Sequence, residues 1–135
     1  MSGDAAEGTV TFTSKNSKIT TNNGDTLYVT NTTAEINLEN NTIINQDKDG
    51  NFLRIQKDSW GNNGSNEGVV TLNMTNQKVT GNIVVDSIST LTINMTDNSY
   101  YEGMINNDNT AKSIKRGKGS CNRNKDCISL CRSRK

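Results

Sequence analysis

Apolar and polar residues alternate along two segments of the chain that match each other position by position. Residues 70–76 read VTLNMTN and residues 91–97 read LTINMTD, so the second segment repeats the first at a separation of 21 residues. A period of two places the apolar side chains on one face of an extended strand and the polar side chains on the other. The pattern predicts two β-strands with one buried face each, at equivalent places in a repeat.

The repeat extends toward the N-terminus. Residues 34–40 read AEINLEN and form a third copy, and residues 10–13 follow the same alternation. Four units therefore begin near residues 10, 34, 69 and 91, and the second unit is the longest because it contains an insertion. In each unit, turns rich in Asn, Asp or Gly separate further short apolar segments, which predict additional strands.

A unit of 21 to 24 residues with three short strands has the size of one coil of a parallel β-helix, whose coils stack about 4.8 Å apart. We therefore predict an all-β fold for residues 1–111, a single-stranded parallel β-helix of about four coils. Stacking in register would align Asn37, Asn73 and Asn94 in one column, where their amides would form a structural ladder. An antiparallel β-sandwich is the alternative, although two-residue hairpin signals are few.

The composition restricts the chemistry available to the chain. It contains no histidine, which removes the most common general base and metal ligand and excludes Ser-His and Cys-His nucleophile pairs. Only 30% of the residues are hydrophobic, as expected for a solenoid in which only the inward positions are apolar. No segment approaches the about 20 apolar residues of a membrane span. We predict that the protein is not an enzyme and has no membrane span.

The charge divides the chain at residue 112. Residues 1–111 carry 6 basic and 13 acidic side chains, whereas residues 112–135 carry 9 basic and 1 acidic. We predict an unstructured basic tail over 112–135, which is either genuine or the product of an interrupted reading frame. Its cysteines, Cys121, Cys127 and Cys131, match no zinc spacing. The tail has no aromatic residue to stack on a base, so no nucleic-acid partner is predicted.

The segments 1–12, 70–74 and 81–91 resemble the right-handed β-helix repeats of bacterial secreted and cell-surface proteins, described as adhesin-like or carbohydrate-binding domain-containing, in the pectin-lyase-like fold group. The resemblance covers residues 1 to about 114 and implies a right-handed helix. It also implies an internal segment of a larger extracellular or cell-surface parent. Residues 1–7 lack the basic and apolar regions of a signal peptide, so we expect the parent to direct export.

Aromatic residues provide the candidate carbohydrate contacts, because an exposed ring forms a flat apolar platform for a sugar. The only tryptophan, Trp60, lies in the insertion of the second unit. Tyr100 and Tyr101 form a second candidate pair, of which we expect one ring to point inward. The alternative for Trp60 is that it covers the core beneath its own loop.

A candidate metal site begins at Asn45. The series Asn45, Asp47, Asp49 and Gly50 matches the first six positions of a calcium-binding loop, although position twelve is Gln56 and not glutamate. The alternative is an ordinary turn between strands. Cofactors are therefore none, or calcium at this turn.

These observations predict a non-catalytic structural or adhesive segment that binds glycans or cell-surface polysaccharide. The alternatives are a calcium-assisted, lyase-like polysaccharide-active enzyme fragment that uses Asp47, Asp49 and Arg54, and a stalk without a ligand. Thr-x-Thr pairs such as Thr11 and Thr13 are not expected to recur from coil to coil. A short stack leaves strand edges open at its ends, which predicts self-association.

Overall fold

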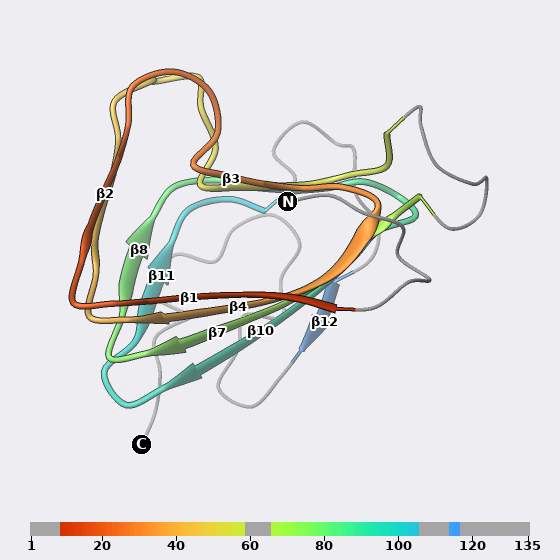
Figure 1. Cartoon of the computed structure of the whole chain (residues 1–135). Helices are drawn as coiled ribbons and strands as arrows, with labels where there is room; N and C mark the ends of the chain where they lie inside the picture. The colour runs from red at the N-terminus through yellow and green to blue at the C-terminus, as the bar shows by residue number, and fades with distance from the viewer. Residues whose placement is uncertain (1–8, 59–65, 106–113, 117–135) are drawn as a thin grey trace.

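The computed structural model describes residues 9–58, 66–105 and 114–116 of the chain (Figure 1). These residues form twelve strands. The strands are β1 (Thr9–Lys15), β2 (Lys18–Thr21), β3 (Leu27–Val29), β4 (Thr32–Glu39), β5 (Thr42–Asn45), β6 (Leu53–Ile55), β7 (Gly68–Thr75), β8 (Lys78–Thr80), β9 (Ile83–Val85), β10 (Thr90–Thr96), β11 (Tyr100–Glu102) and β12 (Ile114–Arg116). In this described part of the chain, no helix is long and apolar enough to cross a membrane.

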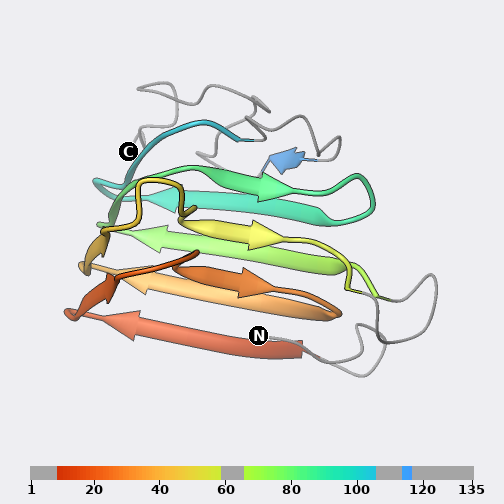
Figure 2. The same ribbon diagram turned by 90° about the horizontal axis from the view of Figure 1, so that it is seen from above.

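The first nine described strands repeat in groups of three, β10 and β11 begin a fourth group, and β12 takes the place of the next first strand. The long first strands of successive units form a five-stranded sheet in the order β1-β4-β7-β10-β12, and the third strands form a sheet in the order β3-β6-β9. The second strands form two separate pairs, β2-β5 and β8-β11. Viewed along the stack, equivalent strands overlie one another on three sides (Figure 1). After a turn of the view, β1, β4, β7 and β10 lie side by side (Figure 2).

Every pairing between these strands is parallel. The prediction of an all-β protein is therefore confirmed, and the antiparallel β-sandwich is wrong, because a sandwich of hairpins would pair neighbouring strands in opposite directions. Parallel pairing requires a connection that returns the chain to its starting side, and the other two strands of each unit provide that return.

The register of the five-stranded sheet confirms the repeat alignment residue by residue. Ala34 lies opposite Val70, and Val70 lies opposite Leu91. Because side chains alternate between the two faces of a strand, an error of one residue would turn the apolar side chains outward. The units differ in length, but their inward apolar positions follow the same pattern. All of them therefore pair in the same register.

The core lies on the inward side of the four sheets. Inward side chains of the long strands alternate with outward ones, so β4 and β7 are buried at every second position. Fully buried examples are Ile36, Leu72 and Ile93. Each buried aliphatic side chain of this size stabilises the fold by about 1.5–3 kcal/mol through its removal from water. The repeated strand is thus also the main source of stability.

The basic tail requires a correction. Residues 114–116 form β12, which pairs in parallel with β10 in the register Leu91 to Ile114. The prediction of an unstructured tail from residue 112 is therefore wrong for these three residues, because backbone pairing with the edge of β10 does not depend on the surrounding charge. The three cysteines of the tail lie outside the described residues.

Single threonines recur on the outward face of the five-stranded sheet, but Thr-x-Thr pairs do not. Thr71 lies opposite Thr92, and Thr75 lies opposite Thr96. In the first unit, Thr9 lies opposite Thr33. Thr11 and Thr13, however, lie opposite Glu35 and Asn37, so the expectation that Thr-x-Thr pairs would not recur from coil to coil is confirmed. Threonine recurs singly at outward positions. Its β-branched side chain suits a half-exposed pleated surface.

Candidate functional site

The corners between the second and third strands divide the molecule into two regions. Residues 22–26 connect β2 to β3, and residues 46–52 connect β5 to β6, so the first two units have long loops here. Only Gly81 and Asn82 connect β8 to β9. In Figure 1 both long loops extend beyond the shorter outline of the later units. We call residues 22–26 and 46–52 the first and second corner loops.

A hollow of about 240 Å³ lies where the second corner loop meets the short corner of the third unit. It opens at this point because β5 pairs with β2 and β8 pairs with β11, while β5 and β8 belong to different sheets. Its lining combines polar loop residues with a small apolar floor. The lining residues are Thr26, Ile43, Asn45, Asp47, Lys48, Gly50, Phe52, Thr80, Gly81 and Asn82.

A second hollow of about 280 Å³ lies on the neighbouring side of the same loop and is lined by Lys48, Asp49, Gly50, Asn51, Arg54, Asn82 and Val84. The two hollows share Lys48, Gly50 and Asn82. Each is slightly smaller than the about 300 Å³ at the lower end of small-molecule sites. Together they form one polar surface around the second corner loop.

Asn45 ties the two corner loops together. Its Nδ2 donates hydrogen bonds to the carbonyl oxygen of Gly24 at 2.9 Å and to Oγ1 of Thr26 at 3.2 Å. Its Oδ1 accepts a hydrogen bond from the N–H of Asp47 at 2.8 Å. Asparagine suits this position because its amide donates and accepts at the same time.

Asp47 forms a second tie between the loops. Its Oδ2 accepts a hydrogen bond from the N–H of Gly24 at 2.7 Å, and its Oδ1 accepts one from the N–H of Asp49 at 2.9 Å. These two backbone hydrogen bonds lower the pKa of the Asp47 carboxyl, because they stabilise the ionised form. The backbone approach is so close that a Cβ at Gly50 would overlap the carbonyl oxygen of Gly24.

Asp25 and Arg54 form an ion pair between the first two units, with Arg54 Nε 2.7 Å from Asp25 Oδ2. Asp25 Oδ1 also accepts hydrogen bonds from the N–H of Asn51 at 2.7 Å and from its Nδ2 at 3.0 Å. Burial raises the pKa of Asp25, but the hydrogen bonds from Asn51 and Arg54 outweigh that effect, so the pKa lies below its ordinary value of 3.8.

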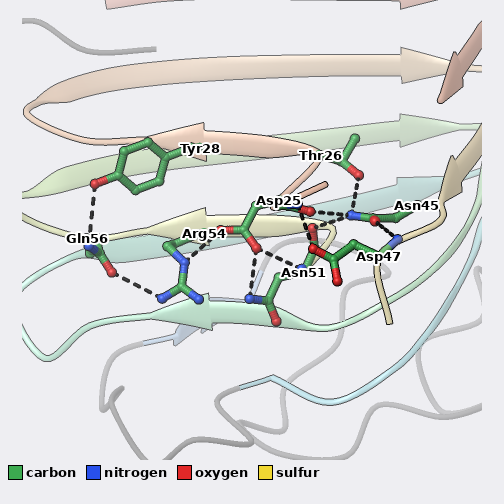
Figure 3. A network of polar contacts seen from close by, with 9 residues as sticks. Asp25, Thr26, Tyr28, Asn45, Asp47, Asn51, Arg54 and Gln56 are labelled. Carbon is green, nitrogen blue, oxygen red and sulfur yellow. Dashed lines mark hydrogen bonds and ion pairs between the residues drawn. The ribbon is translucent and has the colours of Figure 1, made fainter. Parts of the chain in front are cut away.

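The network continues along the outward face of β3 and β6 (Figure 3). Arg54 Nη1 donates to Gln56 Oε1 at 3.2 Å, and Gln56 Nε2 donates to the hydroxyl of Tyr28 at 3.4 Å. Tyr28 is 36% exposed. This face therefore presents an aromatic ring beside a guanidinium group held by a carboxylate.

The candidate calcium residues lie at one turn, but their oxygens have other partners. The carboxylate of Asp47 and the amide oxygen of Asn45 accept the backbone hydrogen bonds described above. Gln56, at the twelfth position, contacts Arg54 and Tyr28. In the described ranges, no group of three His, Cys, Asp or Glu side chains is arranged to hold a metal ion. The geometry is that of consecutive Asx turns.

The aromatic candidates have different environments. Tyr101 is fully buried, and its hydroxyl donates to the carbonyl oxygen of Gly81 at 2.6 Å. The assignment of Tyr101 as a carbohydrate contact is therefore corrected, because its ring packs in the core. Tyr100, the neighbour on the opposite face of β11, is partly exposed. Trp60 lies outside the described residues.

The structure brings the three predicted asparagines together in one column. Asn73 Nδ2 donates to Asn37 Oδ1 at 2.8 Å, and Asn94 Nδ2 donates to Asn73 Oδ1 at 2.9 Å. Asn37 Nδ2 in turn donates to Oγ1 of Thr13 at 3.3 Å. One line of side-chain hydrogen bonds thus joins the first four strands of the five-stranded sheet.

Sequence reasoning missed Asp25, Asn51, Lys48 and Asn82. Asp25 follows Gly24 and reads as a turn residue, and its ion-pair partner lies 29 residues later. No local pattern predicts that contact. The stacking register between β3 and β6 places Tyr28 opposite Arg54. Continued two residues before β3, it places Asp25 opposite Asn51, so it would have indicated the Asn51 contact but not the ion pair.

Comparison with protein-family models, with curated proteins and with solved structures finds no match to the chain.

Proposed function

We propose that the chain is a right-handed parallel β-helix segment of a bacterial extracellular or cell-surface protein, with a non-catalytic structural and adhesive role. The observation that carries this proposal is the unbroken register of the five-stranded sheet. Each unit pairs with the next through backbone and, along the asparagine column, through side chains. An array of this kind provides a rigid support whose outward side chains are available to a partner.

Carbohydrate is the partner that the surface suits best. Sugars present many hydroxyl groups, and the corner region offers amides, hydroxyls and charged groups around a concave surface. The partly exposed rings of Tyr28 and Tyr100 add apolar surface of the kind on which sugar rings pack. The resemblance to adhesin-like, carbohydrate-binding repeats supports the same partner.

The contacts of the candidate catalytic residues support a non-catalytic role. Arg54 is held by Asp25, and Asp47 accepts hydrogen bonds from two backbone N–H groups. A lyase or hydrolase needs an acid and a base directed at one bond of the substrate. Asp47 and Arg54 instead stabilise the two corner loops.

Self-association through the ends of the stack is part of the proposal. The first unit contributes β1, β2 and β3, and each lies at the edge of its sheet. Val10 on β1 is 37% exposed. An edge strand with exposed apolar side chains is a template for pairing with another chain.

The test is a glycan-array screen of the full chain beside Trp60→Ala and Tyr100→Ala variants, after circular dichroism has verified a β spectrum for each. Specific binding by the parent chain is the expected result. Absence of binding by the folded chain would contradict the adhesive role and leave a stalk without a ligand. Cleavage of polygalacturonate, with or without calcium, would instead establish the enzyme alternative.

A further inference from the structure

We propose that the hollow between the second corner loop and the Gly81–Asn82 corner binds one unit of a neutral polysaccharide, with its neighbouring hollow binding the adjacent unit. This inference rests on the proposed carbohydrate-binding function and locates its site. It assigns the contact to Lys48, Thr80 and Asn82, which differ from the aromatic residues considered above.

Two strands that contribute to the hollow, β5 and β8, are joined by buried amides at their starts. Asn41 N–H donates to Oε1 of Gln77 at 2.8 Å, and Gln77 Nε2 donates to the carbonyl oxygen of Asn41 at 3.0 Å. These residues immediately precede β5 and β8, and Gln77 is fully buried. The two strands are therefore joined at their starts, while the corners beyond their ends have different lengths. The separation of β5 and β8 is therefore fixed at their starts.

The loop wall of the hollow is also held in place before any ligand arrives. Asn45 and Asp47 tie the second corner loop to the first through Gly24, and Asn51 ties it to Asp25. A wall fixed by such bonds loses little conformational entropy on binding. Preorganisation of this kind favours a ligand that makes only a few weak hydrogen bonds.

Several lining groups keep hydrogen-bonding capacity for a ligand. Lys48 and Asp49 are exposed at the tip of the loop, and Thr80 is exposed at the end of β8. Asn82 Oδ1 accepts a hydrogen bond from the N–H of Met104 at 3.0 Å, which turns its Nδ2 donor away from that contact. Ile43 and Phe52 supply the apolar floor. Donors and acceptors around an apolar floor match the hydroxyl-covered, weakly apolar surface of a sugar ring.

The charges favour a neutral sugar over an acidic one. Lys48 lies between Asp47 and Asp49 in the sequence, and all three line the two hollows. The other cation of the surface, Arg54, is paired with Asp25. A uronate carboxylate would therefore meet two carboxylates for one available ammonium group, which disfavours its binding.

The experiment is affinity electrophoresis of the full chain in gels that contain a β-glucan, mannan, xylan or polygalacturonate, with EDTA present. We compare the parent chain with Lys48→Ala and Thr80→Val. Lys18→Ala is the matched control, because Lys18 is an exposed lysine of β2 that does not line either hollow. We expect retardation by one of the neutral polymers, weakened about tenfold in both hollow variants, or about 1.4 kcal/mol each, and unchanged in the control.

Two results would overturn the site assignment while the proposed function stands. One is binding that is lost in Trp60→Ala but unchanged in both hollow variants. The other is stronger retardation by polygalacturonate than by every neutral polymer. If the folded chain binds none of the polymers in the gels or on the glycan array, both the site and the adhesive function fail. Amide shifts of Asn82 in NMR spectra with the retained polymer's oligosaccharide provide a readout independent of the variants.

Discussion

Between β5 and β6 the chain leaves the stack for residues 46–52, whereas between β8 and β9 it turns within Gly81 and Asn82. The long strands of the same two units, β4 and β7, nevertheless have the same inward and outward pattern. The loop-bearing region comprises the first two units, and the short-corner region comprises the last two. The difference shows that the sheets and the corners are specified separately: inward apolar side chains fix the sheets, and turn residues fix the corners.

The mode of stabilisation differs between the two regions in the same way. The loop-bearing corners are held by polar side chains, namely Asp25, Asn45, Asp47 and Arg54. The short corners are held by close packing, because a Cβ at Gly103 would overlap the carbonyl oxygen of Gly81. Acid and salt should therefore affect the first region, whereas added side-chain volume should affect the short corners and, in the first region, Gly50.

The largest expected effect tests whether the two regions share one core. Leu72 is fully buried in β7, the strand of the short-corner region that pairs with β4 of the loop-bearing region. Leu72→Ala should lower the free energy of unfolding by about 2–5 kcal/mol, because it removes buried surface and leaves a cavity. Urea unfolding followed by circular dichroism measures this loss, with the outward Thr71→Ala as the control, which should stay within about 0.5 kcal/mol. If hydrogen exchange shows loss of protection in only one region, the shared core is refuted.

The next effect separates packed from open corners. Gly103→Ala should cost about 3 kcal/mol, because the residue has a φ of 157° and its new Cβ would contact the Gly81 carbonyl. Gly24→Ala should cost only about 1 kcal/mol, since its φ of 85° is strained for alanine but no atom lies within 4 Å of the added Cβ. Equal losses in thermal unfolding would show that packing does not distinguish the two kinds of corner.

A smaller effect concerns the acid sensitivity of the loop-bearing region. Asp25→Asn should lower the stability by about 2 kcal/mol at neutral pH, because it weakens the hydrogen bonds to Asn51 and the ion pair with Arg54. The folded pKa of Asp25 lies below 3.8, so the stabilisation is present above about pH 4 and is lost as the pH falls through the folded pKa. The difference between the parent chain and the variant should therefore shrink at pH 3 in urea titrations. Glu102→Gln in the short-corner region is the control; a difference for Asp25→Asn that persists at pH 3 would contradict the prediction.

The smallest effect tests the line of asparagines that crosses both regions. Asn73 has asparagine partners on both sides, whereas Asn94 donates to one. Asn73→Ala should cost about 1 kcal/mol and Asn94→Ala about half as much. The exposed ion pair of Lys15 and Glu39 gives a reference, since Lys15→Ala should cost less than about 0.5 kcal/mol. If all three variants unfold at the same urea concentration as the parent, the ladder contributes no stability.

The sequence predicted the repeated strands well because their signal is local and strong. The alternation in residues 34–40, 70–76 and 91–97 is visible in any short window, and the same residues meet in the sheet register. The asparagine column followed from the same alignment. The prediction of β-structure failed at β12, because a three-residue strand within a basic segment carries too little pattern to outweigh its composition.

The corner region could not be predicted because it depends on distances that the repeat does not encode. β5 pairs with β2 but not with β8, and the hollow lies where these two strands belong to different sheets. The alternation in the sequence does not show where such a separation occurs. The spacing made Asp47 a candidate calcium ligand, with an ordinary turn as the alternative, but Gly24, 23 residues earlier, approaches closely enough to donate to its carboxylate. The spacing alone did not show that approach.

Because the register repeats from unit to unit, the length of the molecule can change without a change in its cross-section. Val69 lies opposite Thr90, and Val70 lies opposite Leu91. Residues 70–90 thus begin and end at equivalent points, so removing or duplicating them would shorten or lengthen the molecule by one layer without changing its cross-section. Insertions that are not whole layers can be accommodated at the corners, as residues 46–52 illustrate. The length of the molecule and its ligand-binding residues can therefore change independently in evolution. The length changes with the number of layers, and the ligand-binding residues change by substitution at a single corner.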